Sequence, residues 1–309
     1  MSERLTKNTL EASFKSMDTE EPIDIYFYRP IGYQWARLFQ KMGVHPNAVT
    51  IASIFIGVAA GIMFYPKDLG LNIIGMLLLI WANSYDSADG QLARMTGKKT
   101  QWGRMLDGFA GDLWFFSIYV SICLRLTPEW GIWIWLLGAF AGFICHTKQS
   151  SLADYYRNIH LYFLKGEAGS ELDNFKQQRE IFHSLPWKGN IWWKLFLYFY
   201  GNYTRSQENM SPDFQKFFSL VKDKYDKNIP QWLRDEFREL SKPLMKYTNI
   251  LTFNVRAIVL FVSLFIDMPW LYFVFEVTVM NVLFFYMRYR HEQLSGLLYH
   301  KVKQERSEK

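Results

Sequence analysis

Six apolar runs constrain the fold of this 309-residue chain more than any other feature of its sequence. Most of them approach the length of about 20 apolar residues that a helix needs to cross the hydrocarbon core of a bilayer. They cover residues 49–65, 71–85, 105–126, 130–145, 250–266 and 270–287. The sequence therefore predicts an all-α integral membrane protein with six transmembrane helices.

The distribution of Lys and Arg predicts the orientation of these helices. Basic residues gather in the N-terminal segment, in residues 94–104 and 148–247, and in the C-terminal tail, whereas the turns at 66–70, 125–129 and 267–269 carry almost none. By the positive-inside rule, both chain ends and residues 94–104 face the cytoplasm. Because the basic residues are spread rather than gathered into one patch, the net charge of +6 does not indicate a nucleic-acid partner. The membrane itself is the expected partner.

The segments outside the spans divide the chain further. Residues 1–45 are predicted to form a tail and an amphipathic helix that lies in the interface, or else packs on the protein itself. Residues 46–147 contain spans one to four, and 248–290 contain spans five and six. Between them, residues 148–247 form a predicted cytoplasmic helical insert whose apolar patch, 191–200, is too short to span and is expected to lie on the membrane. Residues 291–309 form a basic tail.

Four aspartates stand where the second apolar run ends and the third begins: Asp86, Asp89, Asp107 and Asp112. Carboxylates at membrane depth are costly, which makes them candidates for a functional site. Asp86 and Asp89 share one face of a helix, and the short following loop lets Asp107 approach them. Hard oxygen ligands suit Mg²⁺ or Mn²⁺, whereas Zn²⁺ prefers His and Cys. The alternative is that these aspartates are helix caps or solvated loop residues.

Residues near the aspartates suit a phosphate ligand. Arg94 and the basic loop after it supply positive charge, and Gly90 permits a ligand to approach the backbone closely. Since Mg²⁺ and Mn²⁺ commonly hold phosphates, the stretch predicts a two-metal site that carries a nucleotide diphosphate.

The pattern Asp86-x2-Asp89-Gly90-x2-Ala93-Arg94-x8-Gly103-x3-Asp107 resembles the signature of the CDP-alcohol phosphotransferase (phosphatidyltransferase) family. The start of the first run, Pro46-Asn47-x2-Thr50, is also similar, and we expect Asn47 to cap its helix. The resemblance covers roughly residues 40–130.

This resemblance implies a six-helix membrane enzyme that displaces CMP from a CDP-linked substrate with an alcohol. It implies that Asp86, Asp89 and Asp107 hold metal, and that a fourth aspartate both binds metal and acts as the base. The pocket for cytidine diphosphate is implied to contain Gly90, Ala93, Arg94 and Gly103. A homodimer is also expected from the family.

The chain departs from the signature at the fourth aspartate. That residue is expected at position 111, where the chain has Gly111, and Asp112 follows. In an ideal helix this shift turns the carboxylate by about 100°. We hypothesise that a π-bulge between Asp107 and Asp112 absorbs the extra residue, so that Asp112 is the fourth metal ligand and the base.

Several functional alternatives remain open. A CDP-activated lipid could be attacked by inositol, an inositol phosphate or glycerol phosphate, or a CDP-activated small alcohol could be attacked by a lipid hydroxyl. A sphingolipid head-group transferase, such as an inositol phosphorylceramide synthase, is a further alternative. From other classes, a transporter that binds an ion at its intramembrane charges and an inactive scaffold are the competing interpretations.

Other polar residues also have two interpretations each. Arg256, Glu276 and Asn281 in the last two spans could bind a head group or form a buried pair. Tyr155, Arg157 and His160, just beyond the fourth span, could line the cytoplasmic mouth of the site or serve the structure alone.

Overall fold

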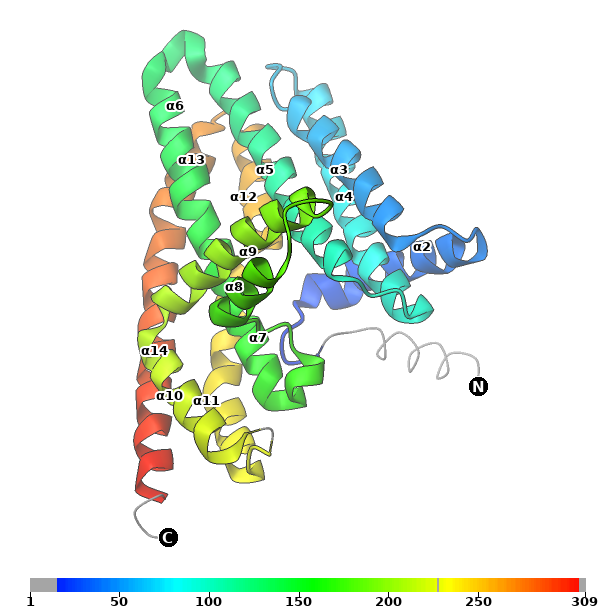
Figure 1. The fold of residues 1–309 in the computed structure, drawn as a ribbon. Helices are drawn as coiled ribbons and strands as arrows, with labels where there is room; N and C mark the ends of the chain where they lie inside the picture. Colours follow the sequence, from blue (N-terminus) through cyan, green and yellow to red (C-terminus); the bar gives the residue numbers. More distant parts are fainter. Residues whose placement is uncertain (1–15, 227, 306–309) are drawn as a thin grey trace. The chain divides into compact units, whose positions relative to one another are not determined.

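The computed structural model describes residues 16–226 and 228–305, and every regular element among them is helical (Figure 1). Four stretches are long and apolar enough to cross a membrane: Leu69–Thr96, Trp102–Trp130, Gln231–Phe265 and Trp270–Glu305. A shorter apolar helix, Pro46–Ile62, has 17 residues, which extend about 25 Å along its axis. The all-α prediction is confirmed for the described residues. The first and fourth predicted spans are not among the four stretches and stay predictions.

The described chain divides into two units. One contains residues 16–147 and 253–279, and the other contains residues 148–252, without residue 227, and 280–305. Residues 1–15 of the predicted tail lie outside the described part of the chain. Both cysteines, Cys123 and Cys145, are buried free thiols.

The first unit holds the segments around the aspartates. Its elements are η1 (Asp24–Tyr28), α2 (Arg29–Lys41), α3 (Pro46–Ile62), α4 (Leu69–Thr96), α5 (Gln101–Trp130), α6 (Ile132–Ala139), η2 (Phe140–His146), α12 (Phe253–Phe265) and α13 (Trp270–Val277).

Side-chain caps begin the three central helices of this unit. The Asp68 carboxylate accepts a hydrogen bond from the Leu71 amide at the start of α4, and the Thr100 hydroxyl accepts one at the start of α5. The cap of α3 is His45, whose Nδ1 accepts a hydrogen bond from the Asn47 amide at 3.2 Å. The prediction that Asn47 caps α3 is therefore wrong. Pro46 occupies the first helical position, where its missing N–H costs nothing, and this places Asn47 one residue inside the helix.

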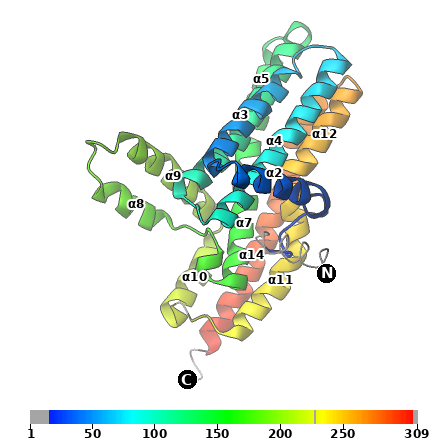
Figure 2. The same ribbon diagram turned by 90° about the vertical axis from the view of Figure 1, so that its right-hand side faces the viewer.

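Close packing of α3, α4 and α5 positions the aspartates, and the three helices lie side by side in Figures 1 and 2. Two glycines on α3, Gly57 and Gly61, make the approach of α5 possible. A Cβ at Gly57 would lie 2.2 Å from the Trp114 ring, and one at Gly61 would lie 2.5 Å from the Ser117 hydroxyl. Glycines four apart allow such backbone contact between membrane helices. The Trp114 side chain is thereby buried in the core of the unit.

A polar cluster lies near the opposite ends of these helices from the aspartates. The buried Arg125 guanidinium donates to the Asn72 side chain at 2.8 Å and to the Asp267 carboxylate at 2.6 Å. Because Asn72 is on α4, Arg125 on α5 and Asp267 between α12 and α13, these bonds link three chain segments. They satisfy a charge that would otherwise be costly inside an apolar bundle.

The second unit is also helical. It contains α7 (Thr147–Lys165), η3 (Glu167–Gly169), α8 (Phe175–Ser184), α9 (Ile191–Met210), α10 (Pro212–Tyr225), α11 (Gln231–Ile250) and α14 (Val279–Glu305). Aromatic rings form its core: Phe163 of α7 stacks on Phe237 of α11 at 3.9 Å between centroids, and Tyr156 of α7 stacks on His291 of α14 at 3.8 Å.

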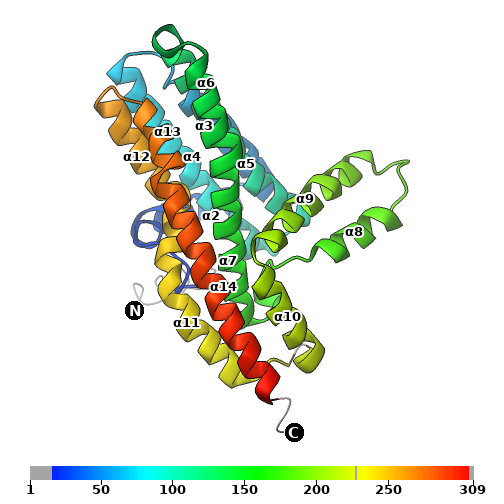
Figure 3. The same cartoon turned by 90° about the vertical axis from the view of Figure 1, so that its left-hand side faces the viewer.

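Helices α8 and α9 form a hairpin within this second unit (Figures 2 and 3). The Lys194 ammonium holds the turn, since it donates to the Leu185 carbonyl at 2.7 Å and lies over the rings of Phe182 and Trp187. The outer face of α9 exposes large apolar side chains at helical spacing: Ile191, Trp192, Leu195, Tyr198 and Phe199. That this face lies on a membrane stays a prediction.

Candidate active site

Helices α4 and α5 bring three of the four aspartates together. Asp86 and Asp89 lie in the last third of α4, which ends at Gly97 in the left-handed conformation that glycine favours. After a short connection, α5 begins at Gln101 and carries Asp107 in its second turn. One carboxylate oxygen from each residue lies within 4.8 Å of the others. We refer to Asp86, Asp89 and Asp107 as the aspartate cluster.

The cluster runs from the protein interior to an open surface. Asp89 is buried with 4% of its surface exposed, Asp86 is half-buried, and Asp107 is exposed. The Thr50 hydroxyl on α3 donates a hydrogen bond to the Asp89 carboxylate. This bond fixes the most buried member of the cluster, and the exposed member leaves a way in for a ligand.

The donor set fits a hard divalent cation. Three carboxylates this close repel one another, and a cation between them removes that repulsion. Oxygen-only donors are typical of Mg²⁺ and Mn²⁺ sites, and the group contains none of the His or Cys ligands that Zn²⁺ prefers. The side chains therefore provide an acidic site that can hold a divalent metal.

Arg94 provides a binding group for an anion beside the cluster. Its Nε and Nη2 atoms are buried and have no hydrogen-bond partner among the residues that the structure describes. Buried donors of this kind are costly unless a ligand satisfies them. A Cβ at Gly90 would lie 3.4 Å from Arg94 Nη1, and a Cβ at Gly103 would lie 3.0 Å from the Asn47 side chain. A larger residue at either glycine would therefore crowd a polar side chain of the site. Ala93 is half-buried on α4.

Asp112 does not belong to the group of carboxylates that the structure brings together. Helix α5 is α-helical from Gln101 to Trp130, so the hypothesis of a π-bulge between Asp107 and Asp112 is wrong. In a regular helix Asp112 points about 140° away from Asp107, whereas Gly111 points only about 40° away. Asp112 is exposed, and a Cβ at Gly111 would meet no atom within 4 Å. The fourth position of the signature therefore has free space but no carboxylate.

The polar residues of the later spans are paired within the protein. The Arg256 guanidinium, on α12, donates to the Glu276 carboxylate on α13, and both side chains are at most 1% exposed. This favours the buried pair over a head-group site. In the second unit, Asn281 accepts a hydrogen bond from Gln149 at 2.9 Å.

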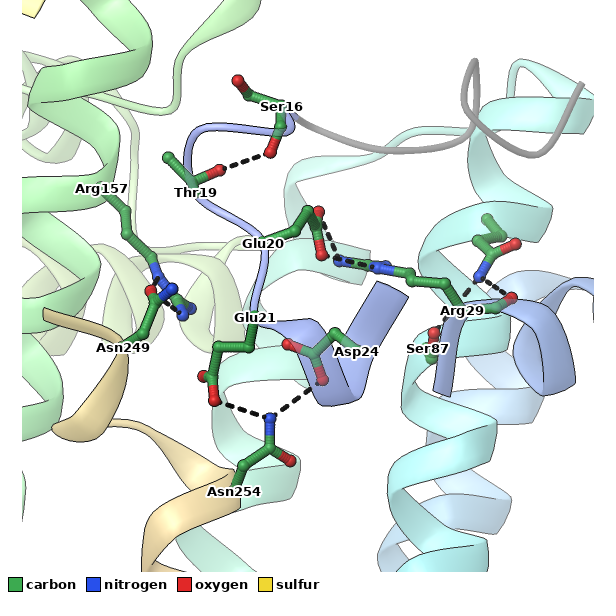
Figure 4. A network of polar contacts seen from close by, with 11 residues as sticks. Ser16, Thr19, Glu20, Glu21, Asp24, Arg29, Ser87, Arg157, Asn249 and Asn254 are labelled. Carbon is green, nitrogen blue, oxygen red and sulfur yellow. Dashed lines mark hydrogen bonds and ion pairs between the residues drawn. The ribbon is translucent and has the colours of Figure 1, made fainter. Parts of the chain in front are cut away.

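The residues beyond the fourth span are held by partners inside the second unit. Arg157 donates to the Asn249 side chain at 2.6 Å (Figure 4), and His160 lies 2.7 Å from the Ser241 hydroxyl. The Tyr155 hydroxyl accepts a hydrogen bond from Gln215. Burial raises the pKa of the Tyr155 hydroxyl above its usual range. These contacts are those of a packed helical core.

Sequence reasoning missed the contribution of the segment before α2. Arg29 forms an ion pair with Glu20 (Figure 4), and its carbonyl accepts a hydrogen bond from Gln91 of α4 at 3.0 Å. The sequence predicts for the segment around Arg29 only an amphipathic helix that lies in the interface or packs on the protein. Nothing in the local pattern indicates its partners, because Gln91 lies 62 residues further along the chain.

Residues 43–158 match the CDP-alcohol phosphatidyltransferase family. An archaetidylinositol phosphate synthase of Pyrococcus horikoshii is 31% identical over 101 residues, which are 32% of this chain and 52% of that protein. A bifunctional IPC transferase and DIPP synthase of Aquifex aeolicus is 25% identical over 97 residues, which are 31% of this chain and 22% of that protein. An uncharacterised Aquifex aeolicus protein is 32% identical over 81 residues, which are 26% of this chain and 40% of that protein.

The similarity thus covers only part of this chain and only part of each relative. The chain spans about half, or less, of the length of the curated relatives it matches. No solved structure matches the chain significantly. The matched region contains α3, α4 and α5 with the whole aspartate cluster, and excludes α8 to α14.

Proposed function

We propose that this integral membrane protein transfers a substituted phosphate from a CDP-linked donor to an alcohol, because residues 43–158 match the CDP-alcohol phosphatidyltransferase family, as their motif predicts. One observation carries the proposal: three carboxylates converge within 4.8 Å beside an arginine whose buried Nε and Nη2 have no partner among the described residues. A cation at the carboxylates and a diphosphate at the arginine would satisfy both sets of groups.

The roles of the side chains follow from their positions. Asp86, Asp89 and Asp107 hold Mg²⁺ or Mn²⁺ in a two-metal site, and Thr50 keeps Asp89 oriented. Bound metal supplies positive charge that stabilises the phosphate oxygens in the transition state. Arg94 binds the diphosphate, and Gly90, Ala93 and Gly103 leave room for the cytidine diphosphate moiety.

In the reaction, the acceptor oxygen forms a bond to the donor phosphorus, and the bond from that phosphorus to the CMP oxygen breaks. The acceptor hydroxyl loses its proton, and CMP leaves as a phosphate monoester. We assign the proton to Asp112, which then acts as a base without being a metal ligand. Five residues of α5 separate the two aspartates, which is about 7.5 Å along the axis and about 140° around it, so the acceptor has to reach from the cluster around α5 to Asp112. Holding both substrates in line accounts for much of the rate.

We propose an inositol-type alcohol as the acceptor and a CDP-activated lipid as the donor. The name of the Pyrococcus horikoshii relative, archaetidylinositol phosphate synthase, supports this choice of head group. The site is proposed to face the cytoplasm, because the basic connection between α4 and α5 lies next to the cluster and basic loops favour that side. Six spans, an interfacial α2 and a homodimer complete the proposed architecture.

The test measures CMP release by purified protein in lipid vesicles. With a CDP-activated diacyl lipid, Mg²⁺ or Mn²⁺, and either inositol or an inositol phosphate, wild-type protein is expected to release CMP and form the corresponding lipid, identified by mass spectrometry. Ceramide with a CDP-linked head group is tested in parallel. Asp89→Asn is expected to release none. Metal-independent release, or no release with any donor and acceptor pair, refutes the proposal.

A further inference from the structure

The segment before α2 is tied to the candidate active site through an ion pair. Arg29, the first residue of α2, donates from Nε and Nη2 to the two carboxylate oxygens of Glu20, at 3.0 and 3.1 Å (Figure 4). The Arg29 side chain is 19% exposed and that of Glu20 is 4% exposed. A two-point pair of this geometry is the arrangement in which Arg binds carboxylates and phosphates.

Helix α2 places Arg29 against the part of α4 that carries the aspartates. A Cβ at Gly32 would lie 2.8 Å from the Ser87 hydroxyl and 3.1 Å from the Ala88 amide, so the two helices touch between Asp86 and Asp89. Gly32 and Arg29 are three residues apart and share a face of α2. The Arg29 carbonyl accepts a hydrogen bond from Gln91, one turn from Arg94 on the same face of α4.

A second contact anchors the segment to another helix of the first unit. The Asn254 side chain, at the start of α12, donates to the carboxylates of Glu21 and Asp24 at 3.0 Å each (Figure 4). The acidic segment Glu20–Asp24 therefore bridges α2 and α12. These two bonds do not involve Glu20, so the segment has anchors that are independent of the Glu20–Arg29 pair.

Two guanidinium groups lie near each other at this site, and among the described residues only Arg29 has a carboxylate hydrogen-bonded to it. The carboxylates of Glu20, Asp107 and Asp89 also act on Arg94, but without a hydrogen bond to its Nε or Nη2. The charges of Arg29 and Glu20 both act on Arg94, and the charge of Arg29 also acts on Asp86. Arg29 is neutralised by Glu20, whereas Nε and Nη2 of Arg94 have no hydrogen-bond partner in the described part of the chain. Like charges this close repel, so a ligand with more than one negative charge suits the pair.

We propose that Arg29 is a second phosphate-binding residue of the site and that Glu20 occupies it as an internal substitute for the phosphate when the site is empty. The ligand carries a phosphate or diphosphate group, and its oxygens replace the Glu20 carboxylate on Arg29 while they also reach Arg94. This inference rests on the proposed function for the identity of the probes. The phosphate could belong to the CDP-linked donor or to a phosphorylated acceptor.

The experiment compares Arg29→Gln, Arg29→Lys and Glu20→Gln with wild-type protein by calorimetric titration in detergent with Mg²⁺. CDP and cytidine probe the donor side, and inositol phosphate and inositol probe the acceptor side. Arg29→Gln is expected to weaken binding of the phosphate-bearing probe about 10-fold or more, and Arg29→Lys is expected to weaken it less, because Lys keeps the charge but loses the two-point geometry. Cytidine and inositol, which carry no phosphate, are expected to be unaffected.

The direction in which Glu20→Gln changes the affinity for the phosphate-bearing probe decides between a competing carboxylate and a purely structural ion pair. Removing the competitor is expected to tighten the same probe about 3-fold or more, whereas a purely structural ion pair would make Glu20→Gln and Arg29→Gln weaken binding together. The matched control is Glu129→Gln, which breaks the exposed Lys67–Glu129 ion pair of the same unit and is expected to change no affinity. A change confined to CDP assigns Arg29 to the donor, and one confined to inositol phosphate assigns it to the acceptor.

Unchanged binding of both probes by Arg29→Gln, or weaker binding by Glu20→Gln, overturns the inference. Binding is measured without turnover, so this failure is separate from failure of the proposed function. If the protein binds CDP through Arg29 but releases no CMP, the role of Arg29 is supported and the proposed function is refuted. If the protein releases CMP but Arg29→Gln leaves the probe affinities unchanged, the proposed function is supported and the role of Arg29 is refuted.

Discussion

Replacing Asp89 by Asn tests whether the aspartate cluster is a cation site, through stability rather than activity. The substitution keeps the size of the side chain, and the amide oxygen can still accept the hydrogen bond from Thr50. It therefore removes one negative charge from the cluster and little else. Without metal, the loss of this charge relieves repulsion and is expected to stabilise the fold. With metal, the same substitution removes a ligand and is expected to reduce the stabilisation that the metal provides.

The size of the relief follows from the geometry of the cluster. Two unit charges 4.8 Å apart repel by about 3.5 kcal/mol at an effective dielectric constant of 20 and by about 0.9 kcal/mol in water. The first value applies to Asp89 with half-buried Asp86, and the second to Asp89 with exposed Asp107. The neighbouring charges of Arg29 and Arg94 already offset part of this sum. We expect Asp89→Asn to stabilise the metal-free protein by about 1–2 kcal/mol, or roughly 2–4 °C in Tm for each kcal/mol.

The two buried thiols allow thermal unfolding to be followed with a thiol-reactive dye. A dye that fluoresces on reaction with Cys123 and Cys145 reports unfolding, since both are buried in the folded protein. In EDTA, Asp89→Asn is expected to melt above wild type. With Mg²⁺ or Mn²⁺ at 100 times its Kd, wild type is expected to gain about 2.7 kcal/mol, and the variant much less. A lower Tm for Asp89→Asn in EDTA, or an equal gain from metal, refutes the assignment of the cluster to a cation.

Three further predictions concern α5 and the α8–α9 hairpin. Asp112→Asn is expected to lower kcat for CMP release about 100-fold or more, as loss of a base does, while leaving the metal-induced rise in Tm intact; a rate within a few-fold of wild type removes Asp112 from the reaction. Gly111→Asp, which has open space around its Cβ, is expected to tighten metal binding several-fold in the same melting assay, and an unchanged affinity would mean that position 111 does not face the cluster. Trp192→Cys, labelled with an environment-sensitive dye, is expected to shift to shorter emission wavelength in anionic vesicles, whereas Lys176→Cys, exposed on α8, is not; equal spectra contradict a membrane-lying α9.

The cluster itself could be predicted from sequence because local rules determine most of it. Asp86 and Asp89 share a face of one helix, and a connection of a few residues returns the chain to Asp107. Only the end-to-end approach of α4 and α5 was needed to join them. The like charges at the end of apolar runs were the signal, and the structure brings those three side chains together.

Other features could not be predicted because they depend on competition between local rules or on distant residues. At the start of α3, Pro46 takes the first helical position, so the cap moves to His45 and not to Asn47. The one-residue shift of Asp112 was expected to distort α5, yet the helix stays regular and Asp112 lies exposed outside the cluster. The pairing of Arg29 with Glu20 and Gln91 depends on how α2 packs on α4, which no local pattern encodes.

The charged residues of the first unit fall into two groups. The sign of the neighbouring charge distinguishes ion pairs that support the fold from residues that we assign to the candidate active site. Arg125 with exposed Asp267, and buried Arg256 with buried Glu276, are pairs of opposite charge that neutralise each other. The aspartate cluster has the reverse character, because it brings carboxylate oxygens of the same sign within 4.8 Å of one another. Folding such a group costs free energy, of which Arg29 and Arg94 offset a part and a bound cation would remove more. Arg94, with two buried nitrogens lacking partners among the described residues, requires an anion in the same way. A cation and an anion bound side by side are what a metal-bound diphosphate provides, and the Glu20–Arg29 pair shows how the chain can supply part of that anion itself.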